Sequence, residues 1–399
     1  MKQGWEIKKL GEVCTIERGG SPRPIDAYIT DEDNGINWIK IGDATLNSRY
    51  ITSTKEKIKP EGVRKSRKVY KGDFILSNSM SFGRPFILDI DGCIHDGWLV
   101  LRDKENIFDK VFLYYYLSSP FIYQEFKRLA VGGVVNNLNI ELVRGVNVFV
   151  PPIAEQEKIV AELDCVSGII EKKKQQLKEL DNLAQSLFYE MFGDPVENDK
   201  GWDVKKIGEV CIVERGGSPR PINAFITDDE NGVNWIKIGD ATEGSRFITS
   251  TKEKIIPEGV RKSRMVYKGD FILSNSMSFG RPYIMGVDGC IHDGWLVLRD
   301  KDNVFDKTYL YYYLGSSYVY QEFKRLAVGG VVNNLNSELV RGVRVAIPAL
   351  NIQQDFASKI ESIEKQKELI AKSIRETETL FNSRMDYYFR DSREIDIKI

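Results

Sequence analysis

The stretch VYKGDFILSNSMSFGRP occupies residues 69–85, and the same letters return without a change at residues 266–282. Aligning Trp5 with Trp202, an offset of 197 residues, extends this match in both directions. Between residues 4 and 150, only 31 of 147 positions differ from their counterparts. The chain therefore carries one module twice, and a surface presented by one copy should be presented by the other.

The segments that follow the modules behave differently. Only 6 of 39 positions agree between residues 154–192 and residues 351–389. The order along the chain is therefore module, connector, module, connector. A period of 197 residues is far longer than the roughly 20–50 residues of a solenoid repeat, so we expect whole domains in tandem.

Length and composition favour two or three folded domains. The 399 residues are 42% hydrophobic and carry a formal charge of −1, from 57 basic and 58 acidic side chains. No overall field therefore attracts the chain to nucleic acid or membrane. The N-terminal residues lack the apolar core of a signal peptide, and no run approaches the ~20 apolar residues of a membrane span. Five scattered cysteines suit a reducing compartment, so we expect a cytoplasmic protein.

The modules are expected to be mixed α/β domains. Short β-branched runs between Gly, Asn, Asp and Pro residues predict strands and turns; these runs are NWIKIGD, DFILSN, CIHDGWLVLRD and VNVFVPP. The clearest helix is predicted over residues 110–129, where aromatic and aliphatic side chains recur every three or four positions. We interpret its tyrosines as core residues rather than a binding surface; they are Tyr114, Tyr115 and Tyr116.

Both connectors are predicted to be long helices with a heptad seam. In the first, alternating steps of four and three residues meet apolar side chains, except that Lys173 interrupts the seam and Ala184 weakens it. In the second, Lys367, Thr377 and Arg384 interrupt the same pattern. Apolar residues at the remaining seam positions predict that the two helices pack against each other.

The ends of these helices are also marked in the sequence. Each helix follows a proline, Pro152 or Pro348, and the first is predicted to end at the letters GDP, residues 193–195. A helix of 39 residues is roughly 58 Å long. Antiparallel packing of two such helices would relate the modules by an approximate two-fold axis. Complementary packing would explain why the connectors diverged, although recent duplication or gene conversion restricted to the modules would give the same pattern.

Duplex DNA suits two like modules on an antiparallel spacer, because its own two-fold symmetry presents inverted half-sites. Local charge supports this partner: residues 55–71 hold eight basic and two acidic side chains, and residues 252–268 hold six and two. Such clusters neutralise phosphates but carry no base information. The alternative is that these charges form an ordinary solvated face.

Candidate DNA contacts divide into two groups. The phosphate-binding candidates are Arg64, Lys65 and Arg67 with their copies Arg261, Lys262 and Arg264. Loops with Asn, Ser and Arg between glycines suit contacts to base edges, although tight turns alone would also explain the glycines. The candidates nearer the bases are Asn78, Ser79, Arg84, Asn136 and Asn137 with their copies Asn275, Ser276, Arg281, Asn333 and Asn334.

The sequence offers little for catalysis. It contains neither a phosphate-binding loop of the G-x-x-x-x-G-K-[ST] type nor a strand-linked G-x-G-x-x-G. The strongest enzyme alternative is a metal-dependent nuclease built on Cys93, His95 and Asp96, or on the copy around His292, but these fall short of four zinc ligands. We therefore expect no catalytic residue, no metal, and histidines that are structural or contact DNA. A coiled-coil scaffold would explain the helices but not the duplicated basic modules.

Several segments resemble the specificity subunits of type I restriction-modification enzymes: GWEIKKLGEVCTIERGGSPRP, KGDFILS, GGVVNNLN followed by ELVRGVNVFVPPIAEQEKIVAELD, and IPALNIQQDFASKI. The resemblance covers essentially the whole chain, in the order recognition domain, helix, recognition domain, helix. Its most specific feature is Pro152 followed by Glu155 and Gln156. The second copy departs from this pair, with Ile352 and Gln353 in its place.

The resemblance implies a DNA-reading subunit without catalytic activity. Each recognition domain would read half of a bipartite, inverted-repeat target, and the helices would dock two methyltransferase (M) subunits that are joined by restriction (R) subunits. Adenine methylation and restriction would follow, with S-adenosylmethionine, ATP and Mg²⁺ bound by the partners and no cofactor in this chain. The expected segments are recognition domains at 1–152 and 201–349, spacer helices at 153–192 and 350–390, a linker at 193–200 and a tail at 391–399.

Overall fold

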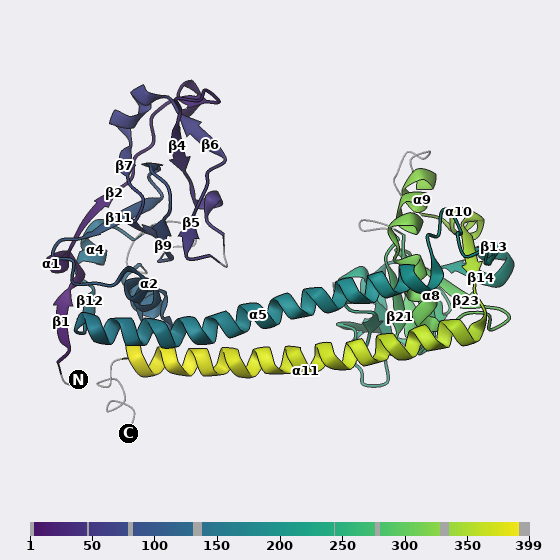
Figure 1. Ribbon diagram of the computed structural model, residues 1–399. Helices are drawn as coiled ribbons and strands as arrows, with labels where there is room; N and C mark the ends of the chain where they lie inside the picture. The colour runs from purple at the N-terminus through teal and green to yellow at the C-terminus, as the bar shows by residue number, and fades with distance from the viewer. Residues whose placement is uncertain are drawn as a thin grey trace. The chain divides into compact units, whose positions relative to one another are not determined.

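The computed structural model describes residues 4–45, 48–78, 83–130, 138–242, 244–275, 280–327 and 335–390. Its contacts divide the chain into two compact units. Unit 1 comprises Met1–Lys174 and Lys372–Ile399, and unit 2 comprises Gln175–Ala371. Each unit therefore combines one module with a stretch of each long helix (Figure 1).

The module of unit 1 is built from short strands and helices. Its strands are β1 (Glu6–Lys9), β2 (Cys14–Arg18), β3 (Ile29–Thr30), β4 (Ile36–Ile39), β5 (Tyr50–Ile51), β6 (Glu56–Ile58), β7 (Arg67–Val69), β8 (Phe74–Ser77), β9 (Pro85–Leu88), β10 (Gly92–Ile94), β11 (Trp98–Asp103) and β12 (Asn147–Val150). Its helices are α1 (Leu10–Val13), α2 (Lys110–Ser118), α3 (Pro120–Ala130) and α4 (Ile140–Arg144), with 3-10 turns η1 (Ile25–Ala27), η2 (Ile41–Asp43) and η3 (Pro60–Lys65).

These strands form two five-stranded sheets and a two-stranded ribbon within the described part of unit 1. The inner sheet has the order β2-β11-β8-β9-β5, the outer sheet the order β3-β6-β4-β10-β7, and β1 pairs with β12. Neighbouring strands are antiparallel except for the pairs β5–β9 and β4–β10. Helices α2 and α3 pack with the inner sheet, whereas the outer sheet lies away from the long helices (Figure 1).

The apolar run DFILS forms a strand whose two faces are both buried. Phe74 and Leu76 belong to the core shared with the helices, whereas Ile75 belongs to the core that also takes in residues of the outer sheet. The side chains of β11 alternate between the same two cores, with Leu99 in the first and Trp98 in the second. Because alternate side chains point to opposite faces, a continuous apolar run identifies a strand covered on both sides.

The helix predicted over residues 110–129 is two helices. Helix α2 ends at Ser118 and α3 begins at Pro120, which has no N–H to continue the backbone hydrogen bonds of α2. The packing role of the tyrosines is confirmed, because Tyr115 and Tyr116 are buried and Tyr114 packs against the same core.

The run CIHDGWLVLRD is likewise not one strand. Strand β10 ends at Ile94 and lies in the outer sheet, whereas β11 begins at Trp98 and lies in the inner sheet. His95 therefore lies in the turn between the sheets, and the prediction that CIHDGWLVLRD forms a single strand is wrong.

The module of unit 2 repeats this architecture. Its strands are β13 (Asp203–Lys206), β14 (Cys211–Arg215), β15 (Ile226–Thr227), β16 (Val233–Ile236), β17 (Phe247–Ile248), β18 (Glu253–Ile255), β19 (Arg264–Val266), β20 (Phe271–Ser274), β21 (Pro282–Met285), β22 (Gly289–Ile291), β23 (Trp295–Asp300) and β24 (Arg344–Ile347). Its helices are α6 (Ile207–Val210), α7 (Pro257–Val260), α8 (Lys307–Leu314), α9 (Ser317–Ala327) and α10 (Ser337–Gly342), with 3-10 turns η4 (Ile222–Ala224) and η5 (Ile238–Asp240).

The two long helices follow the predicted seam. Helix α5 (Ile153–Phe192) ends where Gly193 takes a φ of +77°, and α11 is Leu350–Phe389. The predicted apolar seam positions are buried or half-buried, led by Ile159, Leu163, Val166, Ile170, Phe356, Ile360 and Ile363. None of the helices within the described ranges is long and apolar enough to cross a membrane.

The helices pack antiparallel within each unit. In unit 1, the Lys173 ammonium donates to the Ser373 hydroxyl at 2.6 Å, near the middle of both helices. Further along the same pair of helices, Glu162 of α5 pairs with Arg384 of α11. In unit 2, Lys367 pairs with Asp181 at 2.6 Å. These polar interruptions of the seam thus meet polar partners on the other helix.

Candidate nucleic-acid interface

A glycine turn places the chain after β2 against the turn between β10 and β11. Arg18 ends β2, and the Gly19 N–H donates to the Trp98 carbonyl at 2.9 Å. A Cβ added to Gly19 would lie 2.0 Å from the His95 carbonyl oxygen, so no larger residue fits there without moving the backbone. The loop from Arg18 to Pro24, which we call the anchored loop, is therefore held close to the turn between β10 and β11.

Asp96 is the anchor of this loop. Its carboxylate accepts from the Ser21 hydroxyl at 2.8 Å, and its backbone carbonyl accepts from Arg18 Nε and Asn78 Nδ2, both at 3.0 Å. In unit 2, Asp293 receives the same three contacts, at 2.7 Å from Ser218, 3.0 Å from Arg215 and 2.8 Å from Asn275. The hydrogen bond from Ser218 lowers the pKa of Asp293, so this carboxyl is ionised at neutral pH.

Arg23 is the most exposed arginine of this anchored loop. Its side chain is 84% exposed and its guanidinium lies 3.8 Å from the Asp96 carboxylate. Proline rings on both sides, at Pro22 and Pro24, restrict the backbone that carries it. Its copy Arg220 is 80% exposed and 3.7 Å from Asp293. A solvent-facing guanidinium on a restricted backbone is suited to a phosphate or to the hydrogen-bonding edge of a guanine.

His95 is a structural residue of the turn. Its Nδ1 lies 2.6 Å from the Gly97 backbone nitrogen and its Nε2 lies 3.2 Å from that of Ile41. A neutral imidazole can accept one of these N–H groups, whereas a protonated ring can accept neither. Burial lowers the pKa of His95 and also that of His292, despite the carboxylate beside each ring. Both rings are therefore neutral at pH 7.

The Cys93 thiol beside this turn has no features of a nucleophile. It is fully buried, and burial raises the pKa of its thiol, as it does for Cys290. Within the described ranges, no group of three His, Cys, Asp or Glu side chains is arranged to hold a metal ion. These facts favour the structural interpretation of the DGCIHDGW segments.

The basic segment at the end of η3 and in β7 lies beside the same loop, because a Cβ added to Gly20 would lie 2.9 Å from the Lys65 carbonyl oxygen. Arg64 is exposed and has no carboxylate partner among the described residues. The Lys65 ammonium donates to the Tyr28 hydroxyl at 2.6 Å and is also exposed. Arg67 is half-buried and pairs with Glu17 at 3.1 Å. Arg64 and Lys65 thus keep their charge available to a polyanion, whereas the charge of Arg67 is partly neutralised.

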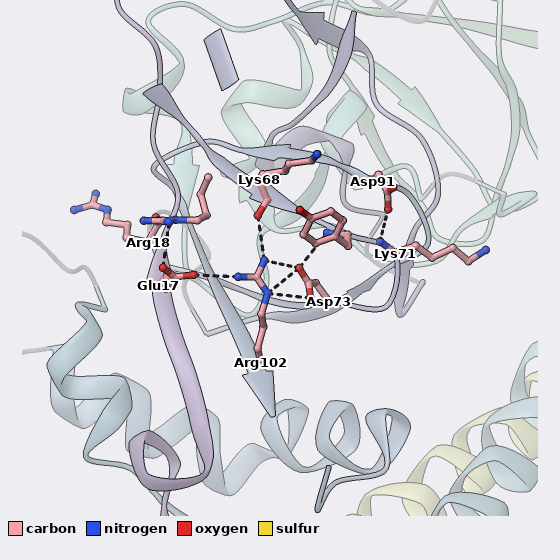
Figure 2. Close-up of polar contacts among 9 residues, drawn as sticks. Glu17, Arg18, Lys68, Lys71, Asp73, Asp91 and Arg102 are labelled. Carbon is pink, nitrogen blue, oxygen red and sulfur yellow. Dashed lines mark hydrogen bonds and ion pairs between the residues drawn. The ribbon is translucent and has the colours of Figure 1, made fainter. Parts of the chain in front are cut away.

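Arg102 fixes the strands under this segment. Figure 2 shows its guanidinium between Asp73 and Glu17, at 2.7 Å and 3.0 Å, with a further hydrogen bond of 3.0 Å to the Lys68 carbonyl. The hydrogen bonds to Asp73 raise the pKa of Arg102. From β11, this arginine therefore joins β2 and the turn before β8 to β7 of the outer sheet, and it orients the Glu17 that pairs with Arg67.

The second basic segment lacks two lysines of the first, because Ile256 replaces Lys59 and Met265 replaces Lys68. Phe225 replaces Tyr28, so the Lys262 ammonium lies over the ring, 4.8 Å from its centroid, without a hydroxyl to bond. Arg264 pairs with Glu214 at 3.1 Å, as Arg67 does with Glu17. Arg261 is exposed, as Arg64 is.

The two candidate loops meet at Asn78. The Leu138 N–H donates to the Asn78 carbonyl at 3.0 Å, so the ends of the loops after β8 and α3 are adjacent. The Asn78 side chain itself is 2% exposed and its amide is bound to Asp96, and Asn275 is equally buried. This placement favours a supporting role for both asparagines over direct contact with a base.

Arg84 lies at the far end of the first of these loops. It is exposed and lines a hollow of about 370 Å³ together with Tyr123 of α3 and Tyr114 of α2. Its copy Arg281 is also exposed. The other candidates nearer the bases lie outside the described residues: Ser79, Asn136, Asn137, Ser276, Asn333 and Asn334.

Sequence reasoning missed Arg18 and Arg23, and with them Arg215 and Arg220. Arg18 contacts the backbone of Asp96, 78 positions away, which no local pattern predicts. A signal for Arg23 was present, because an arginine between two prolines has little backbone freedom to lose on binding a ligand.

Comparisons with known proteins agree with this picture. The model of the family described as type I restriction modification DNA specificity domain matches residues 2–182 and 199–379. The type I restriction enzyme MjaVIII specificity subunit of Methanocaldococcus jannaschii is 22% identical over 93% of this chain and 90% of its own length.

Solved structures show the same fold. A chain from work on complex assembly and conformational transition of the type I R-M system has a TM-score of 0.67 at 22% identity, with 98% of both chains covered. The type I restriction-modification S subunit from M. genitalium has a TM-score of 0.51 at 14% identity, with 97% of this chain and 96% of that chain covered.

Proposed function

This chain belongs to the type I restriction-modification DNA specificity family, with two tandem target recognition domains and no catalytic role of its own, and we propose that each domain binds one half of a bipartite duplex target. The face that binds is built on the anchored loop of Arg18 to Pro24 and the neighbouring basic segment. We assign the recognition domains to residues 1–152 and 201–349 and the spacer helices to residues 153–192 and 350–390, with the linker at 193–200.

The observation that carries this proposal is the repetition of one exposed basic face. Arg18, Arg23, Arg64 and Lys65 recur at the offset of 197, together with the Asp96 anchor that holds the loop. The 31 differences between the modules leave these positions unchanged. Two equal faces suit two like half-sites, and we propose that these half-sites are inverted, because the two strands of duplex DNA are related by two-fold symmetry.

The residues of this face differ in what they can recognise. Arg64 and Lys65, with their copies Arg261 and Lys262, supply charge to phosphates, and Arg67 and Arg264 contribute less because each is paired with a glutamate. Arg23 and Arg84, with Arg220 and Arg281, are the side chains we assign nearest to base edges. Asn78 and Asn275 support the loops, and Ser79, Asn136, Asn137 and their copies remain candidates for base contact.

The proposed assembly contains further subunits. Two methyltransferase (M) subunits would dock on the spacer helices, and restriction (R) subunits would join them. S-adenosylmethionine, ATP and Mg²⁺ would be bound by those partners, in the cytoplasm where the DNA target is, and this chain would hold no cofactor. Adenine methylation at both half-sites, and restriction of unmethylated DNA, would then follow the sequence that this chain selects.

A salt titration of DNA binding tests the proposal. The chain in complex with its methyltransferase subunits should bind a target duplex, and the binding constant should fall steeply as salt rises. Replacing Arg64→Gln and Arg261→Gln should weaken binding to all duplexes and reduce the slope of log K against log salt by about 0.9 for each phosphate that is no longer neutralised. Arg144, which pairs with Glu141 on α4 of the module, offers a control, since Arg144→Gln should change neither quantity. Failure of the complex to bind any duplex would overturn the proposal.

A further inference from the structure

A cavity of about 820 Å³ lies in unit 2, between the recognition module and the two long helices. Residues of the module line one side, among them Arg246, Tyr283, Tyr311 and Tyr312. Helix α5 contributes Asp181 and Phe188, and α11 contributes Glu364 and Lys367. We propose that this cavity is a binding site for a small aromatic anion, a ligand that the DNA-reading function does not require.

The corresponding hollow in unit 1 is smaller and less enclosed by the helices. It measures about 370 Å³ and is lined by residues of the module alone, including Arg84, Phe86, Tyr114 and Tyr123. Every residue that lines the hollow of unit 1 has its counterpart in the cavity of unit 2, and only Phe86/Tyr283 and Ser118/Gly315 differ in residue type among these pairs. The cavity of unit 2 is lined in addition by both long helices and by further module residues, Gly244, Arg246, Tyr312, Ser316 and Ser317.

A second difference concerns one arginine. Arg49 of unit 1 is held by the Asp164 carboxylate at 2.7 Å and the Tyr115 hydroxyl at 3.0 Å. Its copy Arg246 lines the cavity of unit 2 and has no ion pair with any described carboxylate; its guanidinium lies 5.5 Å from the centroid of the Phe247 ring. A guanidinium without a counter-ion in a partly enclosed site favours an anionic ligand.

The acidic residues of the cavity already have a cationic partner, because the Lys367 ammonium lies 2.6 Å from Asp181 and 3.2 Å from Glu364. Arg246 forms no ion pair with a described carboxylate, so we place the anionic group of the ligand beside its guanidinium.

The aromatic side chains that line the cavity indicate that the ligand also carries an aromatic ring. Tyr283, Tyr311, Tyr312 and Phe188 offer faces and edges against which a planar ring can pack. Sites for small organic ligands have volumes of about 300–1,000 Å³ and combine apolar walls with a few polar groups. A mononucleotide-sized anion with one or two aromatic rings meets both conditions.

Fluorescence titration of the full chain with 8-anilinonaphthalene-1-sulfonate tests this site. One probe should bind per chain, and Arg246→Gln should weaken its binding about tenfold by removing the charge-assisted contact. Arg375→Gln removes an exposed arginine outside the cavity and should leave binding unchanged. Uncharged N-phenyl-1-naphthylamine, which keeps the rings without the sulfonate, should bind less tightly than the anion.

A cavity-filling variant provides an independent readout. Gln185→Trp places a larger side chain on the α5 wall of the cavity and should abolish probe binding. Circular dichroism and thermal unfolding establish whether this variant folds. If it does not fold, the effect of Arg246→Gln on probe binding decides whether the probe occupies the cavity. The proposal is overturned if the probe does not saturate at one site, if Arg246→Gln has no effect, or if the neutral probe binds as well as the anion.

Discussion

Arg384 of α11 forms a two-point ion pair with Glu162 of α5, 222 positions away, with Arg384 Nη2 at 3.0 Å from one carboxylate oxygen. The hydrogen bonds from Arg384 lower the pKa of Glu162. Arg384 is one of the residues that interrupt the apolar seam, and so are Lys173 and Lys367, each of which also has a partner on the opposite helix. Polar residues in a seam restrict the registers in which two helices can pack, because only one register satisfies every pair.

Reversal of the Arg384–Glu162 charges should reveal this restriction. Glu162→Arg or Arg384→Glu alone should destabilise the protein by about 1 kcal/mol, because each places like charges together in a half-exposed site. The double reversal should recover most of this stability in thermal unfolding experiments. The exposed pair Lys372 and Glu376 on α11 is the control, and its reversal should change stability by less than about 0.5 kcal/mol. Additive destabilisation in the double variant would show that the pair does not act as a unit.

The glycine turn after β2 should tolerate no side chain. Gly19→Ala with Gly216→Ala should cost at least about 2 kcal/mol per module, because the new Cβ would meet a backbone oxygen at 2.0 Å and 2.1 Å. Gly42→Ala is the matched control, since a Cβ there has nothing within 4 Å. Chemical denaturation of the original chain, the Gly19→Ala/Gly216→Ala variant and the Gly42→Ala variant measures the differences in the free energy of unfolding. Equal stability of Gly19→Ala and Gly42→Ala would contradict the placement of the loop.

Stability should fall as the pH drops below about 6.5, because of His95 and His292. An unfolded histidine titrates near pH 6.5, whereas burial lowers the pKa of both rings in the folded chain. The unfolded state therefore binds more protons in this range, so the free energy of unfolding decreases with falling pH. Denaturant midpoints between pH 8 and pH 5 measure the effect.

Variants that keep the hydrogen bond but not the titration provide the control. His95→Asn with His292→Asn retains an acceptor for the backbone N–H two residues on and carries no ionisable group. Its pH profile should be flatter between pH 7 and pH 5 than that of the original chain. An unchanged profile would assign the acid sensitivity to other groups.

Arg23 and Arg220 should affect which sequence is bound more than how strongly DNA is bound in general. Removing a bidentate hydrogen bond to a base costs about 1–3 kcal/mol at that position alone. Arg23→Gln with Arg220→Gln should therefore relax the methylated motif at one base pair in each half-site, as read by sequencing methylated DNA. Arg64→Gln with Arg261→Gln should weaken binding and leave the motif intact. If Arg64→Gln with Arg261→Gln relaxed the motif and Arg23→Gln with Arg220→Gln only weakened binding, then Arg64 and Arg261 would contact the bases and Arg23 and Arg220 the phosphates.

The long helices were the most predictable part of the fold. Their heptad period, the prolines before them and Gly193 after the first are all local signals, and the structure follows them closely. The partners of Lys173 and Arg384, in contrast, lie 200 or more positions away in the sequence.

The recognition face was only partly predictable. Arg64 and Lys65 were identified from local charge, and both are exposed. Asn78 has the residue type of a base reader but is buried, because its amide holds the Asp96 carbonyl across 18 positions. His95 was placed on a strand because CIHDGWLVLRD reads as one apolar run, whereas the chain passes from one sheet to the other inside it. Sheet assignment depends on long-range pairing that a single segment does not encode.

The central claim is that two equal faces read two equal half-sites in opposite orientations. Mapping of methylated bases across the genome, in cells that carry this chain as their specificity subunit, tests it most directly. We predict that the methylated sites share one motif, made of two inverted, near-identical half-sites separated by a gap of constant length whose bases are not recognised. Two unrelated half-sites, or a continuous motif without a gap, would contradict it.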